Sequence, residues 1–299
     1  MKAIIIAALI ALSFYSCGGN TAGHSYAGTP EVMPLPELPD GIDSVEAPAY
    51  LLNHFWDALD FNDTLRSHNR DFIEQNFANF SQVLIMAGDS VSRRDASRIL
   101  MKKAEADTAA YRLMADVAYH YLYDPNSPLL DEESYIPFLE IFSESQFLDE
   151  AQRGRNRFLL EAALKNRPGM IAADFPYETR RGEKTSLHAT PVKGNLLLIF
   201  YDPDCDNCKE IIGDLSSNHV LNEMIEKGDL TVLAVYSGEE REMWLETNSM
   251  LPQSWIVGYD AGTIDRQDSY YFRATPTIYL LDKDKRVIFK DLPASTLLM

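Results

Sequence analysis

The sequence predicts a two-domain α+β protein in which an N-terminal all-α bundle is followed by an α/β fold with a central mixed sheet flanked by helices. From 47 to 165, apolar residues recur at three- and four-residue steps, which is typical of helices. After Arg167-Pro168-Gly169 the pattern changes to short continuous apolar runs, as in strands covered on both faces. The 299 residues suffice for two ordinary domains. We place the helical domain at 47–167 and the α/β domain at 168–299.

The helical period is clearest in two segments, 72–84 and 110–122. We expect Gly88 to end the first of these helices, because glycine readily adopts the left-handed conformation that follows a helix. Two further helices are expected over 134–142 and 149–164. With the remaining helical stretches, these segments predict a bundle of about five or six helices.

The α/β domain is expected to begin and end with hairpins. Residues 175–187 predict two short strands around a turn at Arg181-Gly182. The runs 277–281 and 286–290 flank a polar turn and predict a second hairpin. The sequence stops soon after it, so we expect the closing helix of the domain to be short or absent.

Between the hairpins lies a strand–helix–strand pattern that contains two cysteines. The continuous apolar runs 195–201 and 230–236 predict buried strands. A helix is expected to begin near Cys205, with Cys208 among the apolar positions on one of its faces. Strand, helix and strand in this order predict a parallel crossover.

A Cys-x-x-Cys pair that follows a buried strand and opens a helix is a strong redox signal. The free N–H groups and partial positive charge of a helix N-terminus stabilise a thiolate. We therefore expect Cys205 to be the nucleophile, and Cys208, within one helical turn of it, to attack a mixed disulfide. An inert structural disulfide and a metal site remain alternatives. Zinc would need ligands beyond this pair, and the six histidines show no paired spacing.

The first residues predict export. Lys2 precedes an apolar run over 3–15 that is too short to span a bilayer, so 1–16 reads as a signal peptide. The following Ser16-Cys17-Gly18-Gly19 resembles a bacterial lipobox. That resemblance implies a lipid on Cys17 and a periplasm-facing lipoprotein in the inner or outer membrane.

Composition narrows the functional classes further. A formal net charge of -18 disfavours binding to nucleic acid and electrostatic docking on anionic headgroups. The stretch 17–46 is rich in proline and glycine and is expected to be a flexible tether. Of three cysteines, lipidation of Cys17 would leave only the Cys205/Cys208 pair, in a compartment where disulfides persist.

Residues 168–299 resemble the thioredoxin-like domains of bacterial thiol–disulfide proteins of the TlpA and ResA type. The resemblance rests on the leading hairpin, the strand before Cys205, the aromatic residue Tyr201 and the segment Arg273-Ala274-Thr275-Pro276-Thr277. It implies a cis peptide bond before Pro276, packing of that proline against the sulfurs, and backbone groups of Thr275 that bind substrate. Two roles remain open for Tyr201: its side chain either packs in the hydrophobic core or contacts the substrate.

The helical half resembles the N-terminal domain of unknown function that accompanies this module in Bacteroides lipoproteins. The matching residues are Phe55-Trp56-Asp57 and Asp60-Phe61-Asn62-Asp63-Thr64. The resemblance implies a shared architecture and no particular activity.

Two departures from thioredoxin concern the pair itself. Thioredoxin-like enzymes often place an acid beneath the second cysteine, and here the corresponding strand position holds Ile199, with Glu210 nearby on the helix. Three aspartates, Asp202, Asp204 and Asp206, lie close to the pair. We expect their charge to raise the pKa of the nucleophile and to favour the disulfide form, as in a reductant or isomerase.

These inferences predict a membrane-tethered thiol–disulfide oxidoreductase that reduces or isomerises disulfides of exported proteins. Cys205 would attack, Cys208 would resolve, and Pro276 would shape the substrate groove. The chemistry needs no organic cofactor or metal, but an unidentified redox partner must return the pair to its working state. The alternative is a non-catalytic binding or assembly lipoprotein, in which the helical domain recognises a partner and the thioredoxin-like half is a scaffold.

Overall fold

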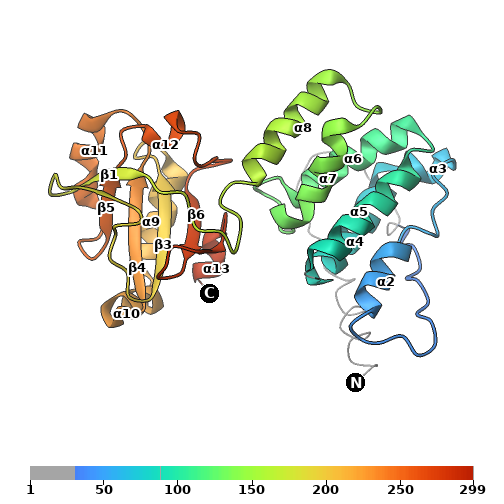
Figure 1. Cartoon of the computed structure of the whole chain (residues 1–299), viewed down its shortest axis with the longest axis horizontal. Helices are drawn as coiled ribbons and strands as arrows, with labels where there is room; N and C mark the ends of the chain where they lie inside the picture. Colours follow the sequence, from blue (N-terminus) through green and yellow to red (C-terminus); the bar gives the residue numbers. More distant parts are fainter. Residues whose placement is uncertain (1–30, 88, 299) are drawn as a thin grey trace. The chain divides into compact units, whose positions relative to one another are not determined.

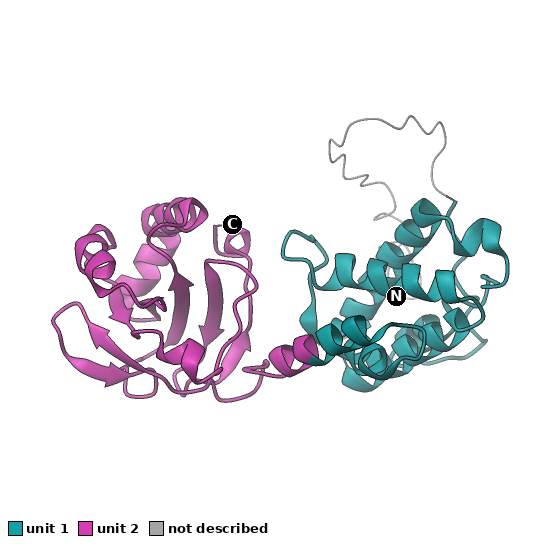
Figure 2. Cartoon of the chain, turned by 90° about the horizontal axis from the view of Figure 1, so that it is seen from above, with its two compact units in different colours: residues 1–157 teal, residues 158–299 magenta. Residues whose placement is uncertain are grey.

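Helices form the N-terminal half, and a mixed sheet with flanking helices forms the C-terminal half, which confirms the predicted fold class. The computed structural model describes residues 31–87 and 89–298. The chain divides into two compact units, 1–157 and 158–299 (Figure 2). The predicted signal peptide, the lipidation site Cys17 and the expected helix stop at Gly88 lie outside the described residues.

Seven helices begin in the described part of the first unit, one of them a single turn absent from the predicted bundle. Aspartates start four of them, because each N-cap carboxylate accepts hydrogen bonds from backbone N–H groups of the first turn. The core is strongly aromatic, with Trp56, Phe77, Phe80 and Phe138 at most 1% exposed. The helices are α2 (Ala47–His54), α3 (Thr64–Ser67), α4 (Arg70–Ala87), α5 (Ser90–Ala104), α6 (Thr108–Leu122), α7 (Glu132–Glu144) and α8 (Glu150–Ala163).

Glu31 and Met33, at the start of the described chain and within the tether expected over 17–46, are held against this bundle. Met33 is buried, and its backbone N–H donates to Asn76 Oδ1 at 2.8 Å. The amide nitrogen of Asn76 in turn donates to the carbonyl of Glu31 at 3.0 Å. A fully buried asparagine that satisfies backbone groups 43 and 45 residues away fixes the path of this segment.

The second unit is built on one seven-stranded sheet in the order β2-β1-β5-β4-β3-β6-β7. The pairs β3–β4 and β4–β5 are parallel, and the other neighbours are antiparallel. Both predicted hairpins form, and β3 lies within the sheet with six of its seven residues buried (Figure 1). The strands are β1 (Pro176–Thr179), β2 (Lys184–Ser186), β3 (Asn195–Tyr201), β4 (Leu230–Tyr236), β5 (Ile256–Tyr259), β6 (Thr277–Leu281) and β7 (Val287–Phe289).

Alternate residues of β3 enter two separate cores, one on each face of the sheet. Ile199 and Tyr201 join a cluster with Cys208 and apolar residues of the flanking helices, and Phe200 packs on the other face against Phe175 and Tyr270. A five-residue helix, α13, follows the last strand. The helices of this unit are α9 (Asp206–Ser217), α10 (His219–Lys227), α11 (Arg241–Thr247), the 3-10 helix η2 (Asn248–Met250), α12 (Thr263–Arg266) and α13 (Ala294–Leu298).

Within the described ranges, no helix combines the length and the apolar character that crossing a bilayer would require.

Candidate active site

Cys205 lies at the turn between β3 and α9 and is the N-cap residue of that helix. Its sulfur accepts a hydrogen bond from the backbone N–H of Cys208 at 3.2 Å. Cys205 is partly exposed, whereas Cys208, one turn into the helix, is 1% exposed. Both are free thiols. The pair therefore has one sulfur that a substrate can reach and one that lies behind it.

A second segment meets the pair from the neighbouring strand. β6 pairs with β3, and Thr275 and Pro276 directly precede β6. The peptide bond between these two residues is cis, as the resemblance implied. The Thr275 carbonyl oxygen lies 3.6 Å from Cys205 Sγ and accepts a hydrogen bond from Asn207 Nδ2 at 3.2 Å. The structure thus brings together the cysteines and the Thr275-Pro276 segment, which are separated by about 70 residues.

The segment before Pro276 is anchored by contacts that the sequence did not indicate. The Arg273 guanidinium donates to the carboxylate of Asp291, and the two side chains are only 7% and 15% exposed. Thr277 Oγ1 donates to the carbonyl of Ala274 at 2.6 Å. These bonds hold both ends of the segment that carries Thr275. No spacing pattern connects residues 273 and 291, so only the fold could reveal this ion pair.

The environment of Cys205 lowers the pKa of its thiol, which corrects the rise expected from the neighbouring aspartates. Burial raises this pKa, but hydrogen bonds with the side chains of Cys208 and Thr275 and with backbone N–H groups outweigh it. The Asp206 side chain is 99% exposed and pairs with Lys209 at 3.2 Å. Water and its counter-charge screen that carboxylate, so its effect on the sulfur is small.

Cys208 has the opposite electrostatic environment. Burial, reinforced by the neighbouring Cys205 sulfur, raises the pKa of its thiol to about 12. Ile199 is fully buried in the adjacent strand, and Glu210 is exposed on α9. Neither position places a carboxylate beneath this thiol, so neither residue accepts its proton. Because its pKa is raised, Cys208 is a neutral thiol at pH 7.

Tyr201 is a core residue at the end of β3. It is 3% exposed, belongs to the same cluster as Cys208, and its ring centroid lies 6.3 Å from that of Tyr236. Its hydroxyl has no hydrogen-bond partner within the described chain.

The described residues hold no group of three His, Cys, Asp or Glu side chains placed to bind a metal ion.

One solved structure resembles the chain over nearly its whole length. It is described as a thioredoxin-like protein from Bacteroides caccae, with 33% sequence identity and a TM-score of 0.79, and the match covers 90% of this chain and 98% of that one. The chain belongs to the thioredoxin-like family. This confirms the resemblance that the residues around Cys205 and Pro276 implied.

Parts of this thioredoxin-like protein also match separately. Residues 18–166 match a family model described as a domain of unknown function (DUF5106). A conserved protein of unknown function from Bacteroides fragilis is 43% identical, with a TM-score of 0.42, over 44% of this chain and 96% of its own. The C-terminal domain of an uncharacterised protein from Bacteroides fragilis is 34% identical, with a TM-score of 0.43, over 44% and 95%. The curated proteins contain no match.

Proposed function

We propose that this thioredoxin-like protein is a thiol–disulfide oxidoreductase that reduces or isomerises disulfides of exported proteins. The observation that carries the proposal is the placement of Cys205. Its sulfur caps α9, is partly exposed, has a lowered thiol pKa and lies 3.6 Å from the Thr275 carbonyl. A thiolate at a helix N-terminus beside an open backbone segment suits nucleophilic attack on a disulfide in an extended chain.

The reaction balances with the two cysteines alone. The Cys205 thiolate attacks one sulfur of the substrate disulfide, so a mixed disulfide forms and the second substrate sulfur leaves as a thiolate that takes up a proton. Cys208 then loses its proton and attacks the Cys205 sulfur. The bond between Cys205 and the substrate breaks, and the second substrate thiol is released. The pair is oxidised by two electrons and the substrate disulfide is reduced by two. In isomerisation, a substrate thiol resolves the mixed disulfide instead.

Repeated reduction needs a partner that carries a thiol reductant and reduces the Cys205–Cys208 disulfide. The place of action follows from the N-terminal sequence. Residues 1–16 act as the export signal, and a lipid on Cys17 holds the protein at the periplasmic side of the inner or outer membrane. Exported substrates in that compartment carry disulfides that need repair.

A single-turnover experiment tests the proposed chemistry. The reduced chain with Cys17→Ser is mixed with oxidised glutathione, quenched in acid and analysed by mass spectrometry. We expect the Cys205–Cys208 disulfide to form. With Cys208→Ser added, the mixed disulfide with glutathione should accumulate on Cys205, and with Cys205→Ser neither product should form at a comparable rate. Equal reaction of all three variants would exclude the proposed roles.

A further inference from the structure

A pocket of about 580 Å³ lies beside Cys208, on the α9 face of the sheet. Its walls come from the end of β3, from α9, from Thr247 at the end of α11 and from 250–252. Its volume is within the range of about 300–1,000 Å³ that ligand sites occupy. Thr275 and Pro276 are not among the described residues that line it. Of the pair, Cys208 lines the pocket and Cys205 does not.

The wall of the pocket is apolar with one buried polar group. Ile212, Leu251 and the 80% exposed Met250 supply apolar surface. Tyr201 also lines the pocket, and its buried hydroxyl has no hydrogen-bond partner among the described residues. Buried tyrosine hydroxyls usually bond to some group. The wall thus offers one donor to a ligand that otherwise buries apolar surface.

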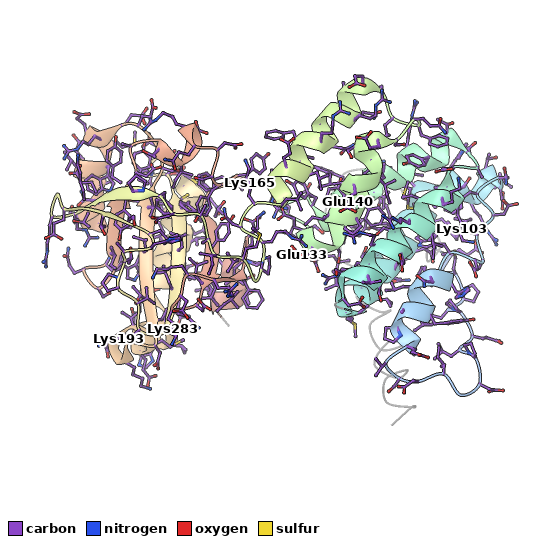
Figure 3. The ribbon with its side chains drawn as sticks, viewed as in Figure 1. Lys103, Glu133, Glu140, Lys165, Lys193 and Lys283 are labelled. Atoms are coloured by element: carbon purple, nitrogen blue, oxygen red, sulfur yellow. The ribbon has the colours of Figure 1, made fainter. Side chains whose placement is uncertain are left out.

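The rim of the pocket is acidic. Asp202 and Asp204 line it, and the basic residue Lys209 on the same wall pairs with Asp206 at 3.2 Å. Two carboxylates and one ammonium group therefore line the pocket, and that ammonium is paired with a third carboxylate; Arg180, which does not line the pocket, donates to the carbonyls of Leu251 and Pro252. Lys193, labelled in Figure 3, precedes β3 and so comes from the opposite end of that strand. This charge distribution favours a positively charged group at the mouth of the pocket.

We propose that the pocket is a substrate subsite that receives an apolar side chain of a polypeptide whose adjacent residue is lysine or arginine. The inference rests on the proposed function, because the pocket can serve a substrate only if a polypeptide disulfide reacts at Cys205, whose sulfur contacts the pocket-lining Cys208. The apolar side chain packs against Ile212 and Leu251, and the basic residue lies beside Asp202 and Asp204. The Tyr201 hydroxyl donates to a carbonyl of the bound segment.

Gly213 offers a way to fill the pocket without disturbing the fold. It is an exposed helical residue of α9 that lines the pocket, and an added Cβ would meet no atom within 4 Å. Gly213→Phe should therefore occupy the subsite, and helix propensity favours the replacement of glycine. Gly154→Phe is the matched control, because this helical glycine of α8 is also open, with the Arg157 side chain 4.0 Å from the added Cβ.

The probes are nonapeptides with a central cysteine in a mixed disulfide with thionitrobenzoate. One series carries Phe-Lys at two, three or four residues from the cysteine on either side, and two matched series carry Ser-Lys and Phe-Glu. The reduced full-length chain with Cys17→Ser attacks each probe. Each rate is divided by the rate at which glutathione attacks the same probe, which removes differences in intrinsic reactivity.

For the wild type we expect the best Phe-Lys peptide to react about tenfold faster than its Ser-Lys and Phe-Glu counterparts, since burial of an aromatic ring supports a ratio of this order. The ratio should fall to about one in Gly213→Phe, decrease in Tyr201→Phe and persist in Gly154→Phe. Equal rates for all peptides, or a ratio that survives Gly213→Phe, would overturn the subsite while leaving the oxidoreductase intact. If the protein attacks no peptide probe faster than glutathione attacks the same probe, the proposed function fails, and the subsite fails with it.

Discussion

The sulfur of Cys205 accepts a hydrogen bond at 3.2 Å from the backbone N–H of Cys208, so the exposed sulfur of the pair is also the N-cap of α9. One contact therefore links the start of the helix to the reactivity of the thiol. The same geometry buries Cys208 beneath the first turn, where its thiol pKa rises to about 12. The chain thus gives its two cysteines opposite acidities within one helical turn.

The first prediction concerns the pKa of Cys205. In the Cys17→Ser chain, alkylation by iodoacetamide should modify Cys205 with a midpoint below the value of about 8.5 for a free thiol. Cys208→Ala should move this midpoint upward, because the hydrogen bond from the Cys208 side chain is lost while burial remains. Asp206→Asn is the control and should leave it unchanged, since that side chain is 99% exposed. A large downward shift in Asp206→Asn would show that the neighbouring aspartates set the pKa of the Cys205 thiol.

The resolving step should keep accelerating with pH above the midpoint of Cys205. Because burial holds the pKa of Cys208 near about 12, only a small fraction of this residue is thiolate at pH 7. The rate at which Cys208 displaces glutathione from Cys205 should rise about tenfold per pH unit between pH 6 and pH 9. Stopped-flow mixing of the preformed mixed disulfide measures it. A plateau below pH 8 would mean that another group accepts the Cys208 proton.

The buried ion pair behind Pro276 should be important for stability. Asp291→Asn removes the charge that meets Arg273 and should lower the free energy of unfolding by about 1.5–3 kcal/mol, because a charge-assisted hydrogen bond between two largely buried side chains is weakened. Asparagine tolerates the left-handed backbone of this position, where φ is 52°. Urea unfolding measures the effect.

Asp268→Asn is its matched control. This aspartate also has a left-handed backbone, with φ at 49°, and it pairs with Lys165 at 2.6 Å, but its side chain is 77% exposed. We expect a cost of about 0–1 kcal/mol. Similar losses in the two variants would show that burial does not set the strength of the Arg273 pair.

The segment that precedes the helices offers a separate test. Asn76→Ala leaves the Met33 N–H and the Glu31 carbonyl without their partner, so we expect a loss of about 1–3 kcal/mol and faster hydrogen exchange at Met33. Asn79→Ala is the control on the same helix, because Asn79 is only half-buried and bonds the Gln75 side chain. Unchanged exchange at Met33 in Asn76→Ala would show that another contact holds this segment.

Much of the fold could be predicted because the apolar pattern changes with the type of element. The continuous run 195–201 became β3, and the turn at Gly182 has the positive φ that only glycine adopts freely. The single-turn helix α3 was missed because four residues are too few to show a period. The attachment of Met33 to Asn76 was missed as well, since a lone polar residue in a helical pattern does not reveal a partner 43 residues away.

The site was predictable where its residues are neighbours in sequence. Cys205 and Cys208 follow a buried strand, so their place at a helix start could be inferred from spacing. The direction of the pKa shift could not, because counting charges ignores which carboxylates face water. The Arg273–Asp291 pair and the pocket beside Tyr201 depend on the meeting of distant segments, and no local pattern encodes such a meeting.

A redox titration of the Cys205/Cys208 pair tests the central claim most directly. The Cys17→Ser chain is equilibrated with dithiothreitol or glutathione buffers, trapped with a thiol reagent and analysed for the fraction oxidised. We predict one reversible two-electron transition between about -270 and -180 mV, the range from thioredoxin to protein disulfide isomerase, because the lowered pKa of Cys205 stabilises the reduced pair. A transition near about -120 mV would make the protein an oxidant and contradict the reducing direction. Failure to form a reversible disulfide would contradict the enzyme itself and favour a binding lipoprotein.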